Sequence, residues 1–111
     1  MIYNLTNLNK KDINKILIEH NNAVVLYHSN TCGYCIDLMP FWKRVTKKHI
    51  KDNNVIIINA EANDIKYLRV KFKKNIIGYP TIIKYSNGKL IGEYDREKKA
   101  KELNNFLKKI I

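Results

Sequence analysis

The stretch AVVLYHSNTCGYCIDLMP, residues 23–40, contains the features that decide the fold. It begins with an apolar run, Ala23–His28, that shows no polar–apolar alternation and is therefore typical of a strand covered on both faces. The segment CGYC follows directly and opens a helix that is predicted to run to about Lys51. Pro40 lies inside this helix and should kink it rather than end it, because the apolar stripe continues beyond it.

The remaining sequence predicts an alternation of strands and helices around this stretch. Further strands are expected at Ile2–Leu5, Asn54–Asn59, Thr81–Tyr85 and Lys89–Tyr94. Further helices are expected from Asn9, a candidate cap, to about His20, from Asn63 or Asp64 through Phe72, and from about Glu97 to Ile110. Asn87-Gly88 indicates a hairpin turn, because this pair tolerates the positive φ of tight β-turns. The order β-α-β-α-β-α-β-β-α predicts an α/β fold with a central mixed β-sheet and helices on both faces.

The composition indicates one small, basic domain, residues 1–111. Hydrophobic residues make up 45% of the chain, which is enough for a core. The net charge of +11 comes from 21 Lys and Arg against 10 Asp and Glu. The lysines are spread along the chain without interleaved aromatic residues, which favours a solvated basic surface over nucleic-acid binding and leaves an acidic partner as the alternative. The abundance of Lys, Asn and Ile is typical of an AT-rich genome, such as that of a parasite or a large DNA virus.

The location of the protein is predicted from what the sequence lacks. No apolar run approaches the roughly 20 residues that span a bilayer. The first residues, MIYNLTNLNKKD, lack the apolar stretch and cleavage site of a secretory signal. If Met1 is the natural start, we expect a cytoplasmic monomer that does not bind membranes and works among reduced thiols.

Cys32 and Cys35 are the only cysteines, and four roles can be considered for them. A disulfide across two residues closes too small a loop to add much stability. Zinc needs four ligands, and His28 and His49 lack the spacing of a zinc site. An inert thiol pair is a third possibility. A redox role accounts for more, because a helix start favours a thiolate at Cys32, and Cys35, one turn further in, would then resolve a mixed disulfide.

The chain resembles the thioredoxin-fold thiol–disulfide oxidoreductases, with thioredoxin and the protein disulfide isomerase domain as relatives. The resemblance rests on residues 23–40, on GYPT at 78–81 and on the YSNG hairpin. It implies the thioredoxin fold, with Cys32 as nucleophile, Cys35 as resolver and a cis Pro80 that faces them. It also implies that the backbone of Tyr79 holds an extended substrate segment. The redox centre would be the reversible disulfide of the two cysteines, without another cofactor, and the partners would be protein disulfides and an electron-donating reductase.

The sequence departs from the family pattern at the proton relay. Leu26 occupies the position of a buried acid, and Ile57 occupies the position of the lysine that often pairs with that acid. Resolution by Cys35 must therefore use water or another base. His28 is the candidate, being on the same strand, and a purely structural histidine is the alternative.

The substrate groove also departs from the pattern. Thr31 replaces the usual Trp, and Gly33-Tyr34 replaces the Gly-Pro of thioredoxins or the Gly-His of the isomerases. Loss of that proline predicts a reduction potential above the value of about −270 mV typical of thioredoxin. Arg96 falls at a glycine of the groove, where it would crowd substrates and add positive charge unless a gap in the alignment leaves it on the surface. The expected substrate contacts are Thr31, Gly33, Tyr34, Tyr79, Pro80 and Arg96.

The resemblance thus implies an enzyme that reduces protein disulfides through the CGYC dithiol. A disulfide-forming or isomerising catalyst, similar to protein disulfide isomerase, is an alternative with the same chemistry. A non-catalytic binding module that docks a partner through its basic surface is an alternative of another class.

Overall fold

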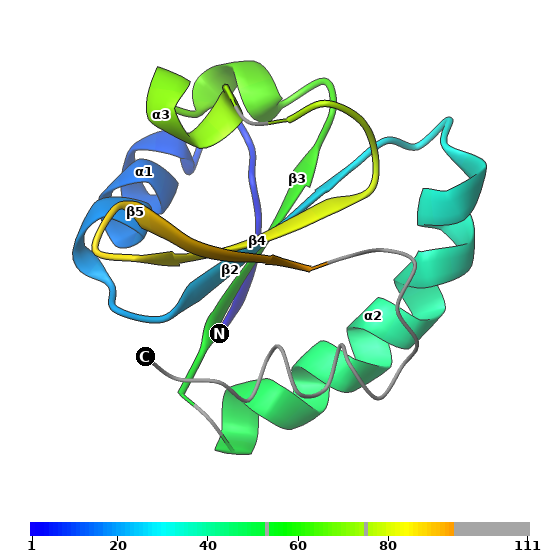
Figure 1. The fold of residues 1–111 in the computed structure, drawn as a ribbon, viewed down its shortest axis with the longest axis horizontal. Coiled ribbons are helices and arrows are strands. Elements are labelled where there is room, and N and C mark those ends of the chain that lie inside the picture. The colour runs from blue at the N-terminus through cyan, green and yellow to red at the C-terminus, as the bar shows by residue number, and fades with distance from the viewer. Residues whose placement is uncertain (53, 75, 95–111) are drawn as a thin grey trace.

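The computed structural model describes residues 1–52, 54–74 and 76–94, which form a five-stranded sheet flanked by helices (Figure 1). The strands are β1 (Ile2–Asn4), β2 (Ala23–His28), β3 (Ile56–Glu61), β4 (Thr81–Ser86) and β5 (Lys89–Tyr94). The helices are α1 (Lys10–Glu19), α2 (Gly33–Asp52), the 3₁₀ turn η1 (Ile65–Tyr67) and α3 (Val70–Lys73). The helix expected from about Glu97 to Ile110 lies outside the described residues. No described helix has both the length and the apolar character needed to cross a membrane.

The sheet has the strand order β1-β3-β2-β4-β5, which places β2 at its centre. β1 and β2 both pair with β3 in parallel, whereas β4 pairs antiparallel with β2 and β5 pairs antiparallel with β4. Val25, for example, lies between Ile58 on β3 and Ile83 on β4. The predicted mixed sheet and the predicted central position of the apolar run are therefore confirmed.

The two faces of β2 pack against different helices, because successive side chains of a strand point to opposite faces. Val25 and Tyr27 belong to the core shared with α1, η1 and α3. Val24 and Leu26 belong to the core shared with α2, which contributes Trp42. Helices thus cover both faces, and α2 continues through Pro40 as predicted.

The β4–β5 hairpin and the start of β3 show how backbone conformation sets strand ends. Asn87 and Gly88 have φ values of +49° and +83°, which confirms the predicted turn. Asn54 also has a φ of +49°, a left-handed conformation that a strand residue does not adopt. The strand β3 therefore begins two residues later than predicted and continues to Glu61.

The third predicted helix is broken in two, and the side chain of Asn14 occupies the break. Leu68 and Arg69 are extended, with ψ values of 153° and 152°. Asn14 accepts a hydrogen bond from the Arg69 N–H (2.9 Å) and donates one to the Tyr67 carbonyl (3.0 Å). Because Asn14 takes up backbone groups that a continuous helix would pair internally, the single helix expected through Phe72 was wrong.

The start of α1 agrees with the prediction, but the expected cap does not form. Asn9 immediately precedes the helix, yet its side chain makes no capping hydrogen bond. It accepts a hydrogen bond from the Thr6 N–H (2.8 Å) and donates one to the Asn4 carbonyl (2.8 Å) instead. Asn9 therefore fixes the loop that joins β1 to α1.

Candidate active site

Cys32 lies at the junction where β2 ends and α2 begins. A turn after β2 is closed by the Cys32 N–H, which donates to the Ser29 carbonyl over 3.1 Å. The Cys32 carbonyl in turn accepts from the Ile36 N–H (3.1 Å), so it receives the first hydrogen bond of α2. Cys32 therefore occupies the N-cap position, as the sequence predicts.

The Cys32 sulfur takes the place of a capping side chain. The Cys35 N–H donates to the Cys32 Sγ over 3.3 Å, and this N–H is one that the first turn of a helix leaves unpaired. Cys32 is half-buried and Cys35 is buried, and both are free cysteines. The pair therefore has one reachable and one shielded sulfur.

The burial of Cys35 separates its chemistry from that of Cys32. Burial, followed by the hydrogen bond with Cys32, raises the pKa of Cys35 from 9.0 to about 11. Cys35 therefore stays protonated at neutral pH until a base removes its proton. The order in which Cys32 attacks first and Cys35 acts second stays a prediction.

The GYPT segment lies directly against Cys32, although it is remote in sequence. The Tyr79–Pro80 peptide bond is cis, as predicted. The Cys32 thiol donates to the Tyr79 carbonyl oxygen over 3.5 Å, and Pro80 is buried. The Thr81 hydroxyl donates to the Gly78 carbonyl over 2.6 Å and so closes the loop that precedes β4. The segment that contains the cis bond thus lies beside Cys32 through the Tyr79 carbonyl, and the role of Pro80 toward the cysteines stays a prediction.

The surface around Cys32 is open, with little side chain over the backbone. A Cβ added at Gly33 or at Gly78 would meet no atom of the described part of the chain within 4 Å. Tyr34 is 77% exposed, and Thr31 is exposed with its hydroxyl 3.0 Å from that of Ser29. An extended chain can therefore approach the sulfur across bare backbone. The remaining predicted contact, Arg96, lies outside the described residues.

The apolar residues at the relay position are fully buried. Leu26 and Ile57 are both 0% exposed and pack with Trp42 on the face that α2 covers. No acid or lysine stands at these two positions, so Cys35 has no ionisable neighbour there. The departure from the family pattern noted in the sequence is therefore a real difference in the core.

His28 ends β2 on the same face of the sheet as Leu26, opposite Glu61 of β3. Burial lowers the pKa of His28, and the nearby Glu61 carboxylate opposes this shift. His28 is thus neutral at pH 7 and able to accept a proton. The groups that shift the pKa of Cys35 are Cys32 and the loop backbone, including that of Ser29, the residue after His28. A relay role for His28 stays a prediction.

Glu61 is a residue of the site that sequence reasoning missed. Its carboxylate accepts hydrogen bonds from the Asn63 N–H (2.8 Å) and the Asn30 N–H (3.1 Å). The first of these bonds is the main reason that the pKa of Glu61 is lowered. Glu61 thereby ties the turn before Cys32 to the end of β3. Only the register of β2 with β3 reveals this role, since nothing in the local sequence distinguishes Glu61.

His28 and His49 are the residues that the sequence offers as possible metal ligands. Among the described residues, no group of three or more His, Cys, Asp or Glu is placed to hold a metal ion. His49 is buried in α2.

Comparison with known proteins connects this geometry to one family. The thioredoxin family model matches residues 4–109. A thioredoxin domain-containing protein 5 homolog from Drosophila melanogaster is 29% identical over 90 residues, which are 80% of this chain and 22% of that protein. Protein disulfide isomerase-like 2-2 from Oryza sativa is 31% identical over 94 residues, 84% of this chain and 24% of that protein. The chain thus spans about a quarter or less of the length of these curated relatives.

A solved structure has the same fold. The reduced thioredoxin pre-protein from Schistosoma mansoni superposes with a TM-score of 0.71 at 21% identity and covers 99% of this chain and 98% of its own. At this level of identity the likeness concerns the fold alone. It agrees with the α/β architecture described above.

Proposed function

Because the chain belongs to the thioredoxin family, we propose that it exchanges its Cys32–Cys35 dithiol with disulfides of other proteins and reduces them. The observation that carries the proposal is the position of the Cys32 sulfur. It receives the Cys35 N–H at 3.3 Å on one side and contacts the Tyr79 carbonyl at 3.5 Å on the other. A sulfur in this position accepts an amide hydrogen bond and lies beside the backbone that an extended substrate would follow.

The proposed reaction has two exchange steps. In the first step, the Cys32 thiolate attacks one sulfur of a substrate disulfide, the substrate S–S bond breaks, and the departing substrate thiolate takes up a proton. In the second step, Cys35 loses its proton to a base and attacks the Cys32 sulfur, which breaks the mixed disulfide. The products are the Cys32–Cys35 disulfide and a substrate dithiol, so that two electrons have passed to the substrate.

We assign the base of the second step to His28, with water as the alternative. The lowered pKa of His28 leaves its ring neutral, which a proton acceptor needs. A hydrogen bond with the backbone of Ser29, the residue after His28, lowers the pKa of the Cys35 thiol. Leu26 replaces the buried acid that the family usually has at this place in the strand.

Substrate binding is assigned to the bare backbone around Cys32. The backbone of Tyr79 would hold an extended substrate segment beside the sulfur, with Pro80 beneath it. Thr31, Gly33 and Tyr34 would border the segment on the other side. The two glycines, Gly33 and Gly78, support this assignment, since no atom of the described residues lies within 4 Å of a Cβ added at either one.

The direction of exchange separates the reductase from an isomerase-like catalyst. Burial holds Cys35 protonated, so ionisation of Cys35 does not stabilise the dithiol, which supports a reductase rather than a strong oxidant. The exposed Tyr34 between the cysteines favours the second candidate, because it replaces the proline of thioredoxins. A redox titration against glutathione distinguishes the two, since a potential near about −180 mV is that of protein disulfide isomerase.

Insulin reduction with dithiothreitol as electron donor tests the proposal. The wild-type protein should accelerate precipitation of the insulin B chain, and Cys32→Ser should abolish the acceleration. Dithiothreitol stands in for the reductase that we propose as the natural electron donor. Acceleration that survives in the Cys32→Ser/Cys35→Ser variant would show that the thiols are not the active groups and would favour a binding module.

A further inference from the structure

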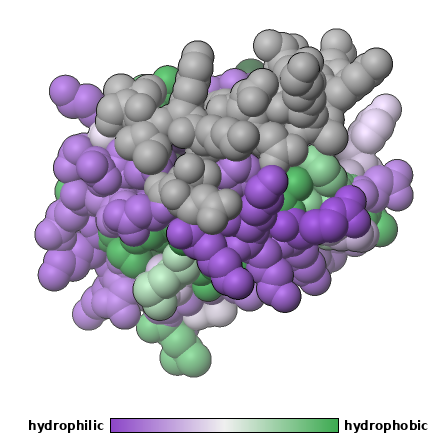
Figure 2. Space-filling model, turned by 90° about the horizontal axis from the view of Figure 1, so that it is seen from below, coloured by the Kyte–Doolittle hydropathy of each residue, from purple (hydrophilic) through white to green (hydrophobic). Residues whose placement is uncertain are grey.

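The distal half of α2 carries a concentrated positive surface. Between Asp37 and Asp52 the sequence contains no acidic residue. The exposed cations of this segment, here called the α2 basic face, are Lys43, Arg44, Lys47, Lys48 and Lys51. At about 100° per residue they span an arc of about 140° on the helix. The face of the molecule that points down in Figure 1 is mostly hydrophilic in the space-filling view (Figure 2).

The spacing of these cations is unfavourable for the helix itself. Lys43 and Lys47 are four residues apart, as are Lys47 and Lys51, and like charges at this spacing destabilise a helix. In α1, Lys11 and Lys15 have the same spacing, but Asp12 and Glu19 lie on the same helix. The α2 basic face differs from α1 in having no acidic residue among its cations.

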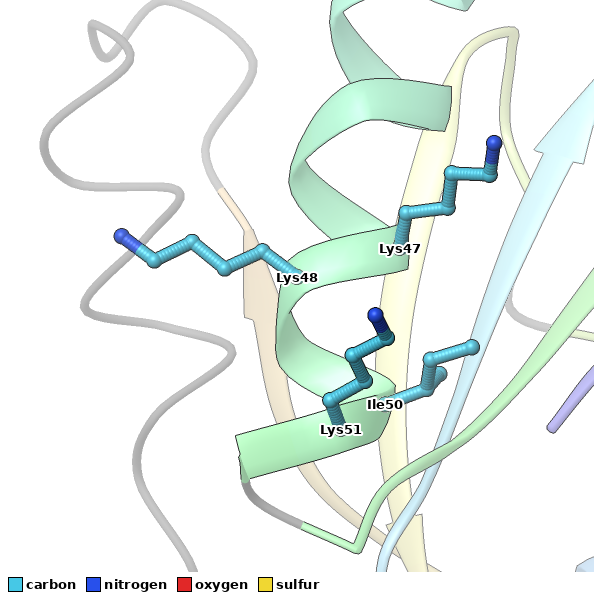
Figure 3. Close-up of a pocket in the computed structure, with 4 residues that line it drawn as sticks. All are labelled: Lys47, Lys48, Ile50 and Lys51. Atoms are coloured by element: carbon cyan, nitrogen blue, oxygen red, sulfur yellow. The ribbon is translucent and has the colours of Figure 1, made fainter.

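Two hollows lie along the α2 basic face. One, of about 400 Å³, lies between β1 and α2, with the buried Trp42 and Asn59 at its floor. Its exposed cations are Lys43, Arg44 and Lys47, and its β1 residue is Ile2. The other lies further along α2 and is lined by Lys47, Lys48, Ile50 and Lys51, with Lys48 extending to the opposite side of the helix from Lys47 (Figure 3).

We propose that the groove between β1 and α2 binds an extended acidic segment of a partner protein. The cations of the α2 basic face would pair with its carboxylates, and Ile2 would contact its apolar parts. In the described sheet β1 is an edge strand, which an extended segment can follow. The groove begins about 12 Å along α2 from Cys35, at a rise of 1.5 Å per residue, so docking leaves the thiols accessible.

The aromatic residues beside the groove favour a peptide over a nucleic acid. Proteins that bind single strands stack bases on exposed aromatic rings. Trp42 is 0% exposed, and its Nε1–H donates to the Asn59 Oδ1 over 2.8 Å. Phe41 is half-buried, and Arg44 lies 5.8 Å from the centre of its ring. Neither ring is exposed for stacking against a nucleic-acid base.

The proposal is tested by titrating the full chain with a fluorescein-labelled decaglutamate peptide and measuring its anisotropy. The test variant is Lys43→Gln/Arg44→Gln/Lys47→Gln. Its matched control, Lys10→Gln/Lys11→Gln/Lys15→Gln, removes the same charge from α1. We expect the test variant to bind about tenfold more weakly and the control to change binding by less than about twofold. Trp42 is the only tryptophan, so a shift of its indole N–H resonance reports occupation of the groove.

Three results would overturn the proposal. Equal weakening in the two variants would show that only net charge matters. An absence of peptide binding by the wild-type chain at low salt would show that the groove is not a site. Tighter binding of an oligothymidine that depends on the same three cations would identify a nucleic-acid surface. Circular dichroism establishes that each variant is folded, and insulin reduction reports separately on the thiols, which the variants do not touch.

Discussion

The amide of Cys35 donates a hydrogen bond to the sulfur of Cys32 over 3.3 Å, so the residue that acts second in the proposed reaction also stabilises the one that acts first. The donor belongs to the backbone and survives replacement of the Cys35 side chain. The two functions of Cys35 can therefore be separated by substitution.

Cys35→Ser should keep the attacking thiol and lose the resolving one. We expect this variant to accumulate mixed disulfides with substrate proteins, because nothing displaces the substrate from Cys32. Non-reducing electrophoresis after incubation with insulin measures the adduct. Cys32→Ser is the matched control and should form none. An adduct in the control, or its absence in Cys35→Ser, would contradict the assigned order.

His28→Gln should slow the second step and remove the pH dependence that protonation of His28 gives to its rate. The pKa of His28 is lowered, so the ring is neutral at pH 7 and becomes protonated only below its ordinary value of 6.5. The wild-type rate of resolution should therefore fall with decreasing pH only below 6.5, and the variant should lack this fall and be about tenfold slower at pH 7. Stopped-flow release of substrate thiol gives the profile. A variant with the wild-type profile would assign the proton to water.

Glu61→Gln should loosen the turn before Cys32. The carboxylate accepts amide hydrogen bonds from Asn30 and Asn63, and its pKa is lowered as a result. We expect a loss of about 0.5 kcal/mol in the free energy of unfolding at pH 7, a small value because the group is partly solvated. The advantage of the wild type is present above the ordinary pKa of 4.5 and disappears as the pH falls through the lowered pKa of the folded state. Urea titrations at pH 7 and pH 3 test this, and an equal difference at both would refute it.

Gly78→Ala should affect substrates without affecting the fold. A Cβ at Gly78 meets no atom within 4 Å, so the variant should unfold within about 0.5 kcal/mol of the wild type. Its kcat/KM for insulin should fall more than that for a small aromatic disulfide, because the methyl group narrows the approach to Cys32.

Gly88→Ala provides the contrasting control for this glycine. Its φ is +83° and its Cβ would lie 3.0 Å from the Lys71 Nζ, so we expect a loss of about 1 kcal/mol in stability. The activity of the folded fraction should be unchanged, since Gly88 lies in the hairpin. If Gly78→Ala lost stability and Gly88→Ala lost activity toward insulin, the proposed substrate path over Gly78 would be refuted.

The parts of the fold that could be predicted from sequence are those with a strong local signal. The apolar run of β2, the Asn87-Gly88 turn and the cysteines at a strand–helix junction each depend on a few adjacent residues. The break between η1 and α3 could not be predicted, because Asn14, which occupies it, is remote in sequence. The position of Glu61 was missed for the same reason, since its contact with Asn30 follows from strand register.

The account depends on a reactive Cys32 beside a protonated Cys35, and alkylation tests this most directly. The reduced chain is treated with substoichiometric iodoacetamide at pH 7, and the labelled residue is identified by peptide mass spectrometry. The account predicts that the label is found on Cys32, with Cys35 modified only after unfolding. Equal labelling of the two cysteines, or no labelling of Cys32 in the folded protein, would contradict it.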